Sequence, residues 1–205
     1  MAHPLIERMV PSGAQSAAAD EPARALAAPT PSFADVYQEH FDFVWRSARR
    51  LGIGAGAIED FVQEVFVVVH RQLARFEGRS TLRTWLYGIV LRAVREHRRV
   101  TRRADARRAP APAGGCDSSV DTAALPDEQL ALSQAARILE QVLDEMAPER
   151  REVFVMAELE QMSIPEIAAL TGDKINTVYS RLRLAREDFE RSVVRRHARD
   201  AWRVR

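Results

Sequence analysis

Apolar residues recur at helical spacing in two long stretches of the chain, residues 33–100 and 127–198. In the first stretch the spacing predicts helices over about 33–51, from about 57 onward, and from just after Ser80 to about 100. The run Val67-Val68-Val69 falls inside a 3.6-residue period, so its β-branched residues do not indicate a strand. The pattern therefore predicts an all-α fold, made of two small helical domains.

Each helix of the first domain carries one apolar stripe, which we expect to be buried. In the first helix this stripe is Val36, Tyr37, His40, Phe41, Val44, Trp45 and Ala48. In the second it is Ile58, Phe61, Val62, Val65, Phe66, Val69 and Leu73, and in the third Leu82, Trp85, Leu86, Ile89, Val90, Ala93 and His97. The opposite face of the second helix is polar and includes Asp60, Gln63, Glu64 and Val67. Taken alone, that face is what any solvated helix shows.

A short loop, Phe76–Thr81, precedes the third helix, and we expect Ser80 to be the N-cap. Its glycine, hydroxyls and arginine, beside aromatic residues and an arginine-rich helix, could hold an unstacked base. The same loop is also an ordinary capped turn between helices. Trp85 falls in the apolar stripe and is predicted to be core, whereas Tyr87 lies off the stripe and is the better candidate for touching bases.

The second domain contains the clearest local pattern in the chain. Ser163 and Glu166 form a capping box that begins a short helix, and Thr171-Gly172 ends it. Asp173 is the expected N-cap of a second helix, whose buried positions are Ile175, Val178, Leu182, Ala185 and Phe189. Two helices joined by a glycine turn form either a helix-turn-helix, which places its second helix in the major groove, or a plain corner of a helix bundle. The exposed Asn, Thr, Ser and Arg residues favour DNA binding.

Charge is segregated along the chain, although the net charge is only +1. Residues 92–108 hold eight Arg against two acids, a net charge of +6, and residues 117–149 hold eight acids against one Arg, a net charge of −7. The basic block indicates a nucleic-acid partner. Lys174 is the one lysine beside 29 arginines, which reflects either phosphate recognition or a GC-rich genome.

Composition divides the rest of the chain and excludes several classes of protein. Residues 1–32, rich in Ala and Pro, are predicted to be a disordered extension, residues 101–126 a flexible linker, and residues 199–205 a basic tail. No stretch is apolar enough to enter a membrane, and the N-terminus has charges where a signal peptide needs an apolar core. The single Cys116 excludes an internal disulfide. No catalytic constellation, cofactor motif or metal-ligand cluster is evident, so we expect a cytoplasmic protein that is not an enzyme.

Two segments in this order resemble one family. Residues 58–66, IEDFVQEVF, and 76–86, FEGRSTLRTWL, are similar to region 2 of extracytoplasmic-function (ECF) sigma factors of the sigma-70 family. Glu166-Ile167-Ala168, Thr177–Leu182 and Ala185-Arg186 resemble their region 4. The resemblance covers about residues 33–190. It implies a dissociable subunit that binds core RNA polymerase and directs promoter recognition and melting, with residues 33–100 as region 2 and residues 127–198 as region 4.

The resemblance also implies roles for individual residues. The face that docks on the polymerase clamp helices would comprise Asp60, Gln63, Glu64 and Val67. The −10 promoter element would be recognised and melted by Arg79, Ser80, Thr81, Arg83, Tyr87, Arg92, Arg95 and Arg99. The −35 element would be read by Lys174, Asn176, Thr177, Tyr179, Ser180, Arg181 and Arg183. The polymerase flap and an anti-sigma factor are further candidate partners, and the linker would thread toward the active-site cleft.

The chain departs from the family pattern at three positions. Tyr179 and Leu184 stand where the family commonly has Lys or Arg, and Arg92 replaces a frequent Asn. A promoter consensus therefore cannot be transferred from relatives. Two other readings stay open at this point: a stand-alone helix-turn-helix regulator that binds duplex operator DNA without polymerase, and a pure protein-interaction module, which the arginine-rich helix argues against.

Overall fold

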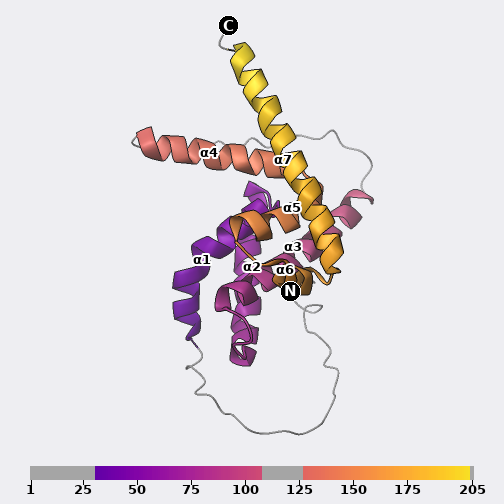
Figure 1. Ribbon diagram of the computed structural model, residues 1–205. Coiled ribbons are helices and arrows are strands. Elements are labelled where there is room, and N and C mark those ends of the chain that lie inside the picture. The colour runs from indigo at the N-terminus through magenta and orange to yellow at the C-terminus, as the bar shows by residue number, and fades with distance from the viewer. Residues whose placement is uncertain (1–30, 108–126, 204–205) are drawn as a thin grey trace. The chain divides into compact units, whose positions relative to one another are not determined.

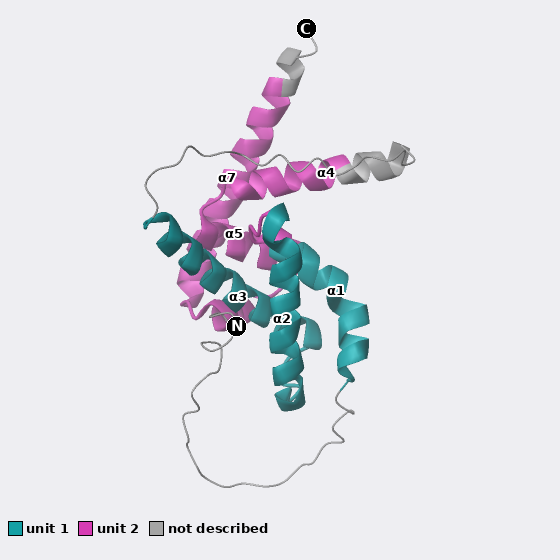
Figure 2. Ribbon diagram, turned by 180° about the vertical axis from the view of Figure 1, so that it is seen from behind, with its two compact units in different colours: residues 1–48, 55–114 teal, residues 49–54, 115–205 magenta. Residues whose placement is uncertain are grey.

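The computed structural model describes the backbone of residues 31–107 and 127–203, with side chains described for 31–107 and 134–199 (Figure 1). The predicted N-terminal extension, up to residue 30, and most of the predicted linker lie outside these ranges. Every regular element in the described ranges is helical, which confirms the prediction of an all-α fold. The chain divides into two compact units, residues 1–48 with 55–114 and residues 49–54 with 115–205 (Figure 2).

The first unit is built on three helices: α1 (Phe33–Arg50), α2 (Ile58–Gln72) and α3 (Leu82–Asp105). Short 3-10 turns, η1 (Ala55–Ala57) and η2 (Leu73–Arg75), stand at the two ends of α2. The core contains fully buried aliphatic side chains from each helix, among them Val44, Val65 and Ile89. Burying a side chain of this size contributes about 1.5–3 kcal/mol, so these stripes are the main source of the unit's stability.

Helix α3 differs from the prediction at both ends. Its N-cap is Thr81 and not Ser80, because the Thr81 hydroxyl accepts a hydrogen bond from the backbone N–H of Thr84 at 3.1 Å. At the other end the helix runs to Asp105, five residues into the segment predicted to be linker. The arginine-rich block is therefore largely helical.

The second unit contains α4 (Asp127–Asp144), α5 (Pro148–Phe154), α6 (Ile164–Thr171) and α7 (Ile175–Arg203). A π-helical turn, η3 (Val155–Leu159), follows α5. Helix α7 packs against α5, α6 and α4, and the buried residues Val153, Met156, Ile167 and Val178 form the centre of this unit. Because α7 continues to Arg203, the predicted basic tail begins as helix.

Candidate nucleic-acid interface

Helix α2 has a polar face that core packing leaves accessible. Asp60 and Gln63 are exposed, Glu64 is half-buried, and Val67 is 37% exposed. The spacing of three and four residues places all four on one side of the helix, while the apolar residues between them are buried. We call these four residues the α2 face. They are the residues that the family resemblance assigns to polymerase docking.

A row of aromatic residues on α1 borders the α2 face, and sequence reasoning misplaced it. Tyr37 is 42% exposed, and Phe41 and Trp45 are half-buried, although all three were predicted to be in the core. The residues of α1 that are buried are Val36, Phe43, Val44, Ser47 and Ala48. The Tyr37 and Phe41 ring centroids lie 4.7 and 6.1 Å from that of Phe66 on α2. These rings and three residues of the α2 face, Asp60, Gln63 and Val67, line one groove of about 830 Å³.

The loop before α3 is open to solvent on its polar side. Arg79, Ser80, Thr81 and Arg83 are all exposed. Gly78 has a φ of 70°, the left-handed conformation that glycine adopts at little cost. The Arg79 guanidinium pairs with Glu77 at 2.5 Å, an exposed ion pair that a phosphate could displace.

The prediction that Tyr87 contacts bases is wrong, because its side chain is 0% exposed. Tyr87 comes directly after the stripe residue Leu86 and was therefore expected on an exposed side of the helix. However, every residue of α3 from Leu86 to Leu91 is buried. The Tyr87 ring lies 6.3 Å from that of Phe43 on α1. Trp85, predicted to be core, is half-buried and lies 5.3 Å from the ring of Phe76. Of the two aromatic residues, the ring beside the loop is therefore that of Trp85.

Two arginines of the predicted −10 surface are held by neighbouring side chains. The Arg83 guanidinium carbon lies 4.4 Å from the centre of the Phe43 ring, a cation–π contact. Arg99 forms a double hydrogen bond with Glu96, and its Nε donates at 2.7 Å. This hydrogen bond raises the pKa of Arg99 above its usual value. Arg92 is exposed and Arg95 is half-buried on the same helix.

Helices α6 and α7 form the predicted helix-turn-helix. The Glu166 carboxylate accepts hydrogen bonds from the Ser163 backbone N–H at 2.8 Å and from its hydroxyl at 2.7 Å, which completes the capping box. These bonds lower the pKa of Glu166. Gly172 ends α6 with a φ of 74°, and α7 begins at Ile175. Asp173 was the expected N-cap of α7, but it is the Lys174 carbonyl that accepts hydrogen bonds from the N–H groups of Thr177 and Val178, at 2.9 and 3.1 Å.

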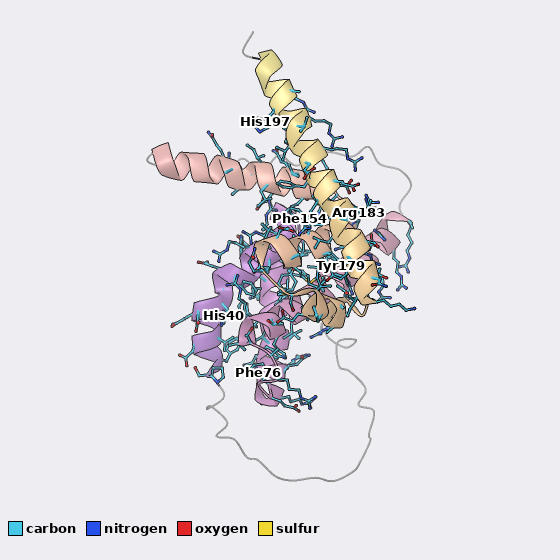
Figure 3. The ribbon with its side chains drawn as sticks, in the orientation of Figure 1. His40, Phe76, Phe154, Tyr179, Arg183 and His197 are labelled. Carbon is cyan, nitrogen blue, oxygen red and sulfur yellow. The ribbon has the colours of Figure 1, made fainter. Side chains whose placement is uncertain are left out.

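The first turns of α7 present most of the residues predicted to read the −35 element. The exposed members of that set are Lys174, Asn176, Tyr179, Ser180 and Arg183, and Thr177 is half-buried. Figure 3 labels Tyr179 and Arg183 on this part of α7. The Arg183 guanidinium pairs with Glu187 at 2.5 Å while 69% of its side chain stays exposed.

Two side chains here do not follow the sequence prediction. Arg181 is only 28% exposed and pairs with the Asp173 carboxylate at 2.5 Å, so its guanidinium is held against the turn. Ile175, predicted to be buried, is 48% exposed. The cause is its position in the first turn of α7, ahead of the buried Val178 and Leu182.

Arg186, in the family's Ala-Arg position, connects α7 to the turn after α5. Its Nε and Nη2 atoms lie 2.8 and 2.7 Å from the same carboxylate oxygen of Glu158. The preceding Ala185 is 0% exposed. This pair of residues therefore positions α7 within the unit, a role that the sequence pattern alone did not show.

Within the described residues no group of three or more His, Cys, Asp or Glu side chains could hold a metal ion. No helix in the same ranges is both long and apolar enough to cross a bilayer.

Comparison with known proteins identifies the class. Residues 36–104 match the family described as Sigma-70 region 2, and residues 136–189 match Sigma-70, region 4. The two matches together cover more than half of the chain, in the order that sigma factors have. The chain is therefore a sigma-70 family protein, a member of the class that directs RNA polymerase to promoters.

The relatives define the group more narrowly. The chain is 31% identical over 166 residues to the ECF RNA polymerase sigma factor SigE of Mycolicibacterium smegmatis, covering 78% of this chain and 60% of that protein. It is 30% identical over 153 residues to the ECF RNA polymerase sigma-E factor of Escherichia coli K12, covering 69% of this chain and 76% of that protein. The chain belongs to the ECF sigma factors. The match of residues 36–104 to region 2 disfavours the stand-alone helix-turn-helix regulator.

Two solved structures share the fold. One is CnrH in complex with the cytosolic domain of CnrY, with a TM-score of 0.55 and 24% identity over 78% of this chain and 86% of that chain. The other is RpoE of Bartonella quintana in complex with the anti-sigma factor NepR, with a TM-score of 0.55 and 21% identity over 78% of this chain and 96% of that chain.

Proposed function

We propose that this chain is a dissociable initiation subunit that binds core RNA polymerase, recognises promoters through two separate surfaces, and captures the melted −10 strand. The observation that carries the proposal is that one chain presents both an accessible α2 face in its region 2 unit and an accessible helix-turn-helix in its region 4 unit. Packing within each unit leaves its surface accessible to a partner. Its place of action is the cytoplasm, where polymerase and promoters are found, and we expect it to catalyse no reaction of its own.

The α2 face is the proposed contact with the polymerase clamp helices. Carboxylate and amide groups offer hydrogen-bond acceptors to a basic partner, and Val67 adds an exposed apolar contact at 37%. The aromatic row of α1 continues this surface along one groove. A mixed polar and aromatic surface of this kind is typical of specific protein interfaces.

The loop at 76–81 and the exposed start of α3 form the proposed −10 surface. Arg79, Arg83 and Arg92 are exposed cations that can contact the DNA backbone. A splayed base would stack beside Trp85 and Phe76, because aromatic rings stack on any base. Strand opening then needs no hydrolysis. Binding of the flipped base by the protein offsets the free energy of unstacking it, which is roughly a few kcal/mol.

The first turns of α7 are the proposed −35 surface. A helix-turn-helix places the N-terminal residues of its second helix against base edges in the major groove. Asn176 suits a bidentate contact to adenine, and Arg183 suits guanine or phosphate, and both are exposed here. The polymerase flap is the expected protein contact of this unit, and an anti-sigma factor is a further expected partner, because the solved structure of RpoE holds one.

The test of polymerase docking uses two matched double variants. Gln63→Ala with Glu64→Ala removes the polar centre of the α2 face, and Gln38→Ala with Glu39→Ala removes the same two residue types from an exposed part of α1. We expect only the first variant to weaken binding to core RNA polymerase, measured by fluorescence anisotropy of the labelled chain. Both variants should stay folded, because Gln38, Glu39 and Gln63 are exposed, where substitutions shift stability by about 0.5 kcal/mol or less, and Glu64 is only half-buried. Equal affinity for core in all three proteins would refute the docking assignment.

A further inference from the structure

Two large apolar side chains stand in solvent on the first turns of α7. Ile175 is 48% exposed and Tyr179 is 57% exposed. They are four residues apart, which places them on the same side of the helix. Val178 and Leu182, on the same stripe, are buried, whereas Ile175 lies one turn ahead of them and Tyr179 beside them, so packing of this unit leaves about half of each of these two side chains exposed.

The surroundings of this pair are polar and cationic. Asn176 and Arg183 are exposed on the adjoining side of α7, and Lys174 is exposed just before it. The pair is therefore an apolar spot framed by hydrogen-bond donors, at the end of the helix that a helix-turn-helix directs into the major groove. A purely electrostatic DNA contact would need no apolar residues at this place.

The major groove offers one apolar group to such a spot. Among the four bases of DNA, thymine alone carries a methyl group on its major-groove edge, at C5. Isoleucine is a purely apolar contact for a methyl group, and tyrosine combines an apolar ring with a hydroxyl that can reach a phosphate oxygen. The chemistry of the pair thus matches thymine better than any other base.

We propose that Ile175 and Tyr179 read thymine in the −35 element through its C5-methyl group, and that this contact sets part of the promoter specificity of this chain. The proposal rests on the proposed function, in which the first turns of α7 lie in the −35 major groove. It assigns to Tyr179 a role that a lysine or arginine at this position cannot perform, because a cation favours phosphate or guanine.

The experiment uses core RNA polymerase loaded with the full chain and a −35 element selected from randomised duplex DNA. Each thymine of the selected element is then replaced singly by deoxyuridine, which removes only the methyl group. Losing one buried methyl should weaken binding about four-fold. We expect this loss at one or two thymines for the parental protein. With Ile175→Ala or Tyr179→Ala, the deoxyuridine substitution at the matching position should have no further effect.

The control variant is Val194→Ala, because Val194 is also exposed and apolar, at 66%, but lies far along the same helix. It should keep the parental response to deoxyuridine. Circular dichroism of each variant verifies that α7 still forms.

The outcomes separate this proposal from the proposed function. If no deoxyuridine substitution weakens binding, or if the selected element contains no thymine, the proposal of methyl readout is overturned. The assignment of α7 to the −35 element would still stand if Asn176→Ala or Arg183→Ala weakened binding to that element. If Ile175→Ala and Tyr179→Ala weaken binding to core polymerase with no response to deoxyuridine, the pair is a protein contact and the proposal also fails. If scrambling the −35 element changes nothing, the proposed function itself fails.

Discussion

Replacing Tyr87 by alanine tests whether this ring belongs to the core or to the DNA surface. Its side chain is 0% exposed and packs on Phe43. Removing a large buried aromatic side chain typically costs about 3–5 kcal/mol, through the lost transfer free energy and the cavity that remains. We therefore expect Tyr87→Ala to lower the free energy of unfolding of the first unit by roughly that amount. Because the total stability of a small domain is about 5–15 kcal/mol, this change would remove a substantial part of it.

Two comparison variants make the magnitude specific. Tyr87→Phe keeps the ring and removes only the hydroxyl, so its cost should be no more than about 1–3 kcal/mol. Tyr179→Ala makes the same chemical change at a position that is 57% exposed, and its cost should be within about 0.5 kcal/mol. The loss in free energy of unfolding should therefore be largest for Tyr87→Ala, smaller for Tyr87→Phe and smallest for Tyr179→Ala.

The assay is urea unfolding of the full chain, followed by tryptophan fluorescence. Trp45 and Trp85 both lie in the first unit, so the signal reports mainly on the unit that contains Tyr87. Circular dichroism reports on both units and shows whether their transitions coincide. A Tyr87→Ala protein with the parental unfolding midpoint, combined with a defect in opening promoters, would refute the burial of this ring and restore it to the DNA surface.

Three further predictions follow from particular contacts. Asp173 holds Arg181 against the turn. We therefore expect Arg181→Ala to weaken binding to cognate and to scrambled −35 duplexes alike, by less than about 1 kcal/mol, measured in a salt titration of binding. A loss of binding confined to one base pair would contradict this. The hydrogen bonds from Ser163 lower the pKa of Glu166, so its contribution to stability is present above the unfolded-state carboxyl pKa and disappears as pH falls through the lower folded-state value. Unfolding measured against pH should lose this dependence in Glu166→Gln, and an unchanged profile would refute it. Trp85→Ala should reduce permanganate reactivity of −10 thymines more than it reduces closed-complex formation, and equal effects would remove the ring from base capture.

The sequence was sufficient for the elements whose ends are set by local chemistry. Ser163 with Glu166 and the left-handed Gly172 mark the two ends of α6, because caps and turns depend on a few neighbouring residues. The α2 stripe was also predictable, since its apolar residues repeat every three or four positions over fifteen residues. The accessible α2 face follows directly from that stripe.

Helical periodicity did not predict burial correctly where burial depends on how many rows of a helix its neighbours cover. On α1 the aromatic row Tyr37, Phe41 and Trp45 has ideal helical spacing, yet the core lies against the adjacent row that contains Val36 and Val44. On α3 the reverse holds, because the helix is enclosed around Tyr87 and no single stripe describes it. Spacing shows that an apolar row exists, but tertiary packing decides how many rows are covered.

The pairing of charged residues could not be predicted from the pattern either. Asp173 with Arg181 spans eight residues across a turn, and Glu158 with Arg186 joins two elements 28 residues apart. The first contact depends on the conformation of the turn before α7, and the second on how η3 packs against α7, and helix propensity encodes neither. The contact with Asp173 changes the expected role of Arg181 from a base contact to a restrained cation.

Transcription in vitro from a genomic fragment library, with permanganate mapping of melted thymines, tests the central claim most directly. Core RNA polymerase supplemented with the full chain should start transcripts at a defined set of fragments, and thymines near each start should become reactive only when both proteins are present. If the chain bound duplex sites alone while core polymerase gained neither transcripts nor permanganate-reactive thymines from it, the assignment as an initiation subunit would be contradicted.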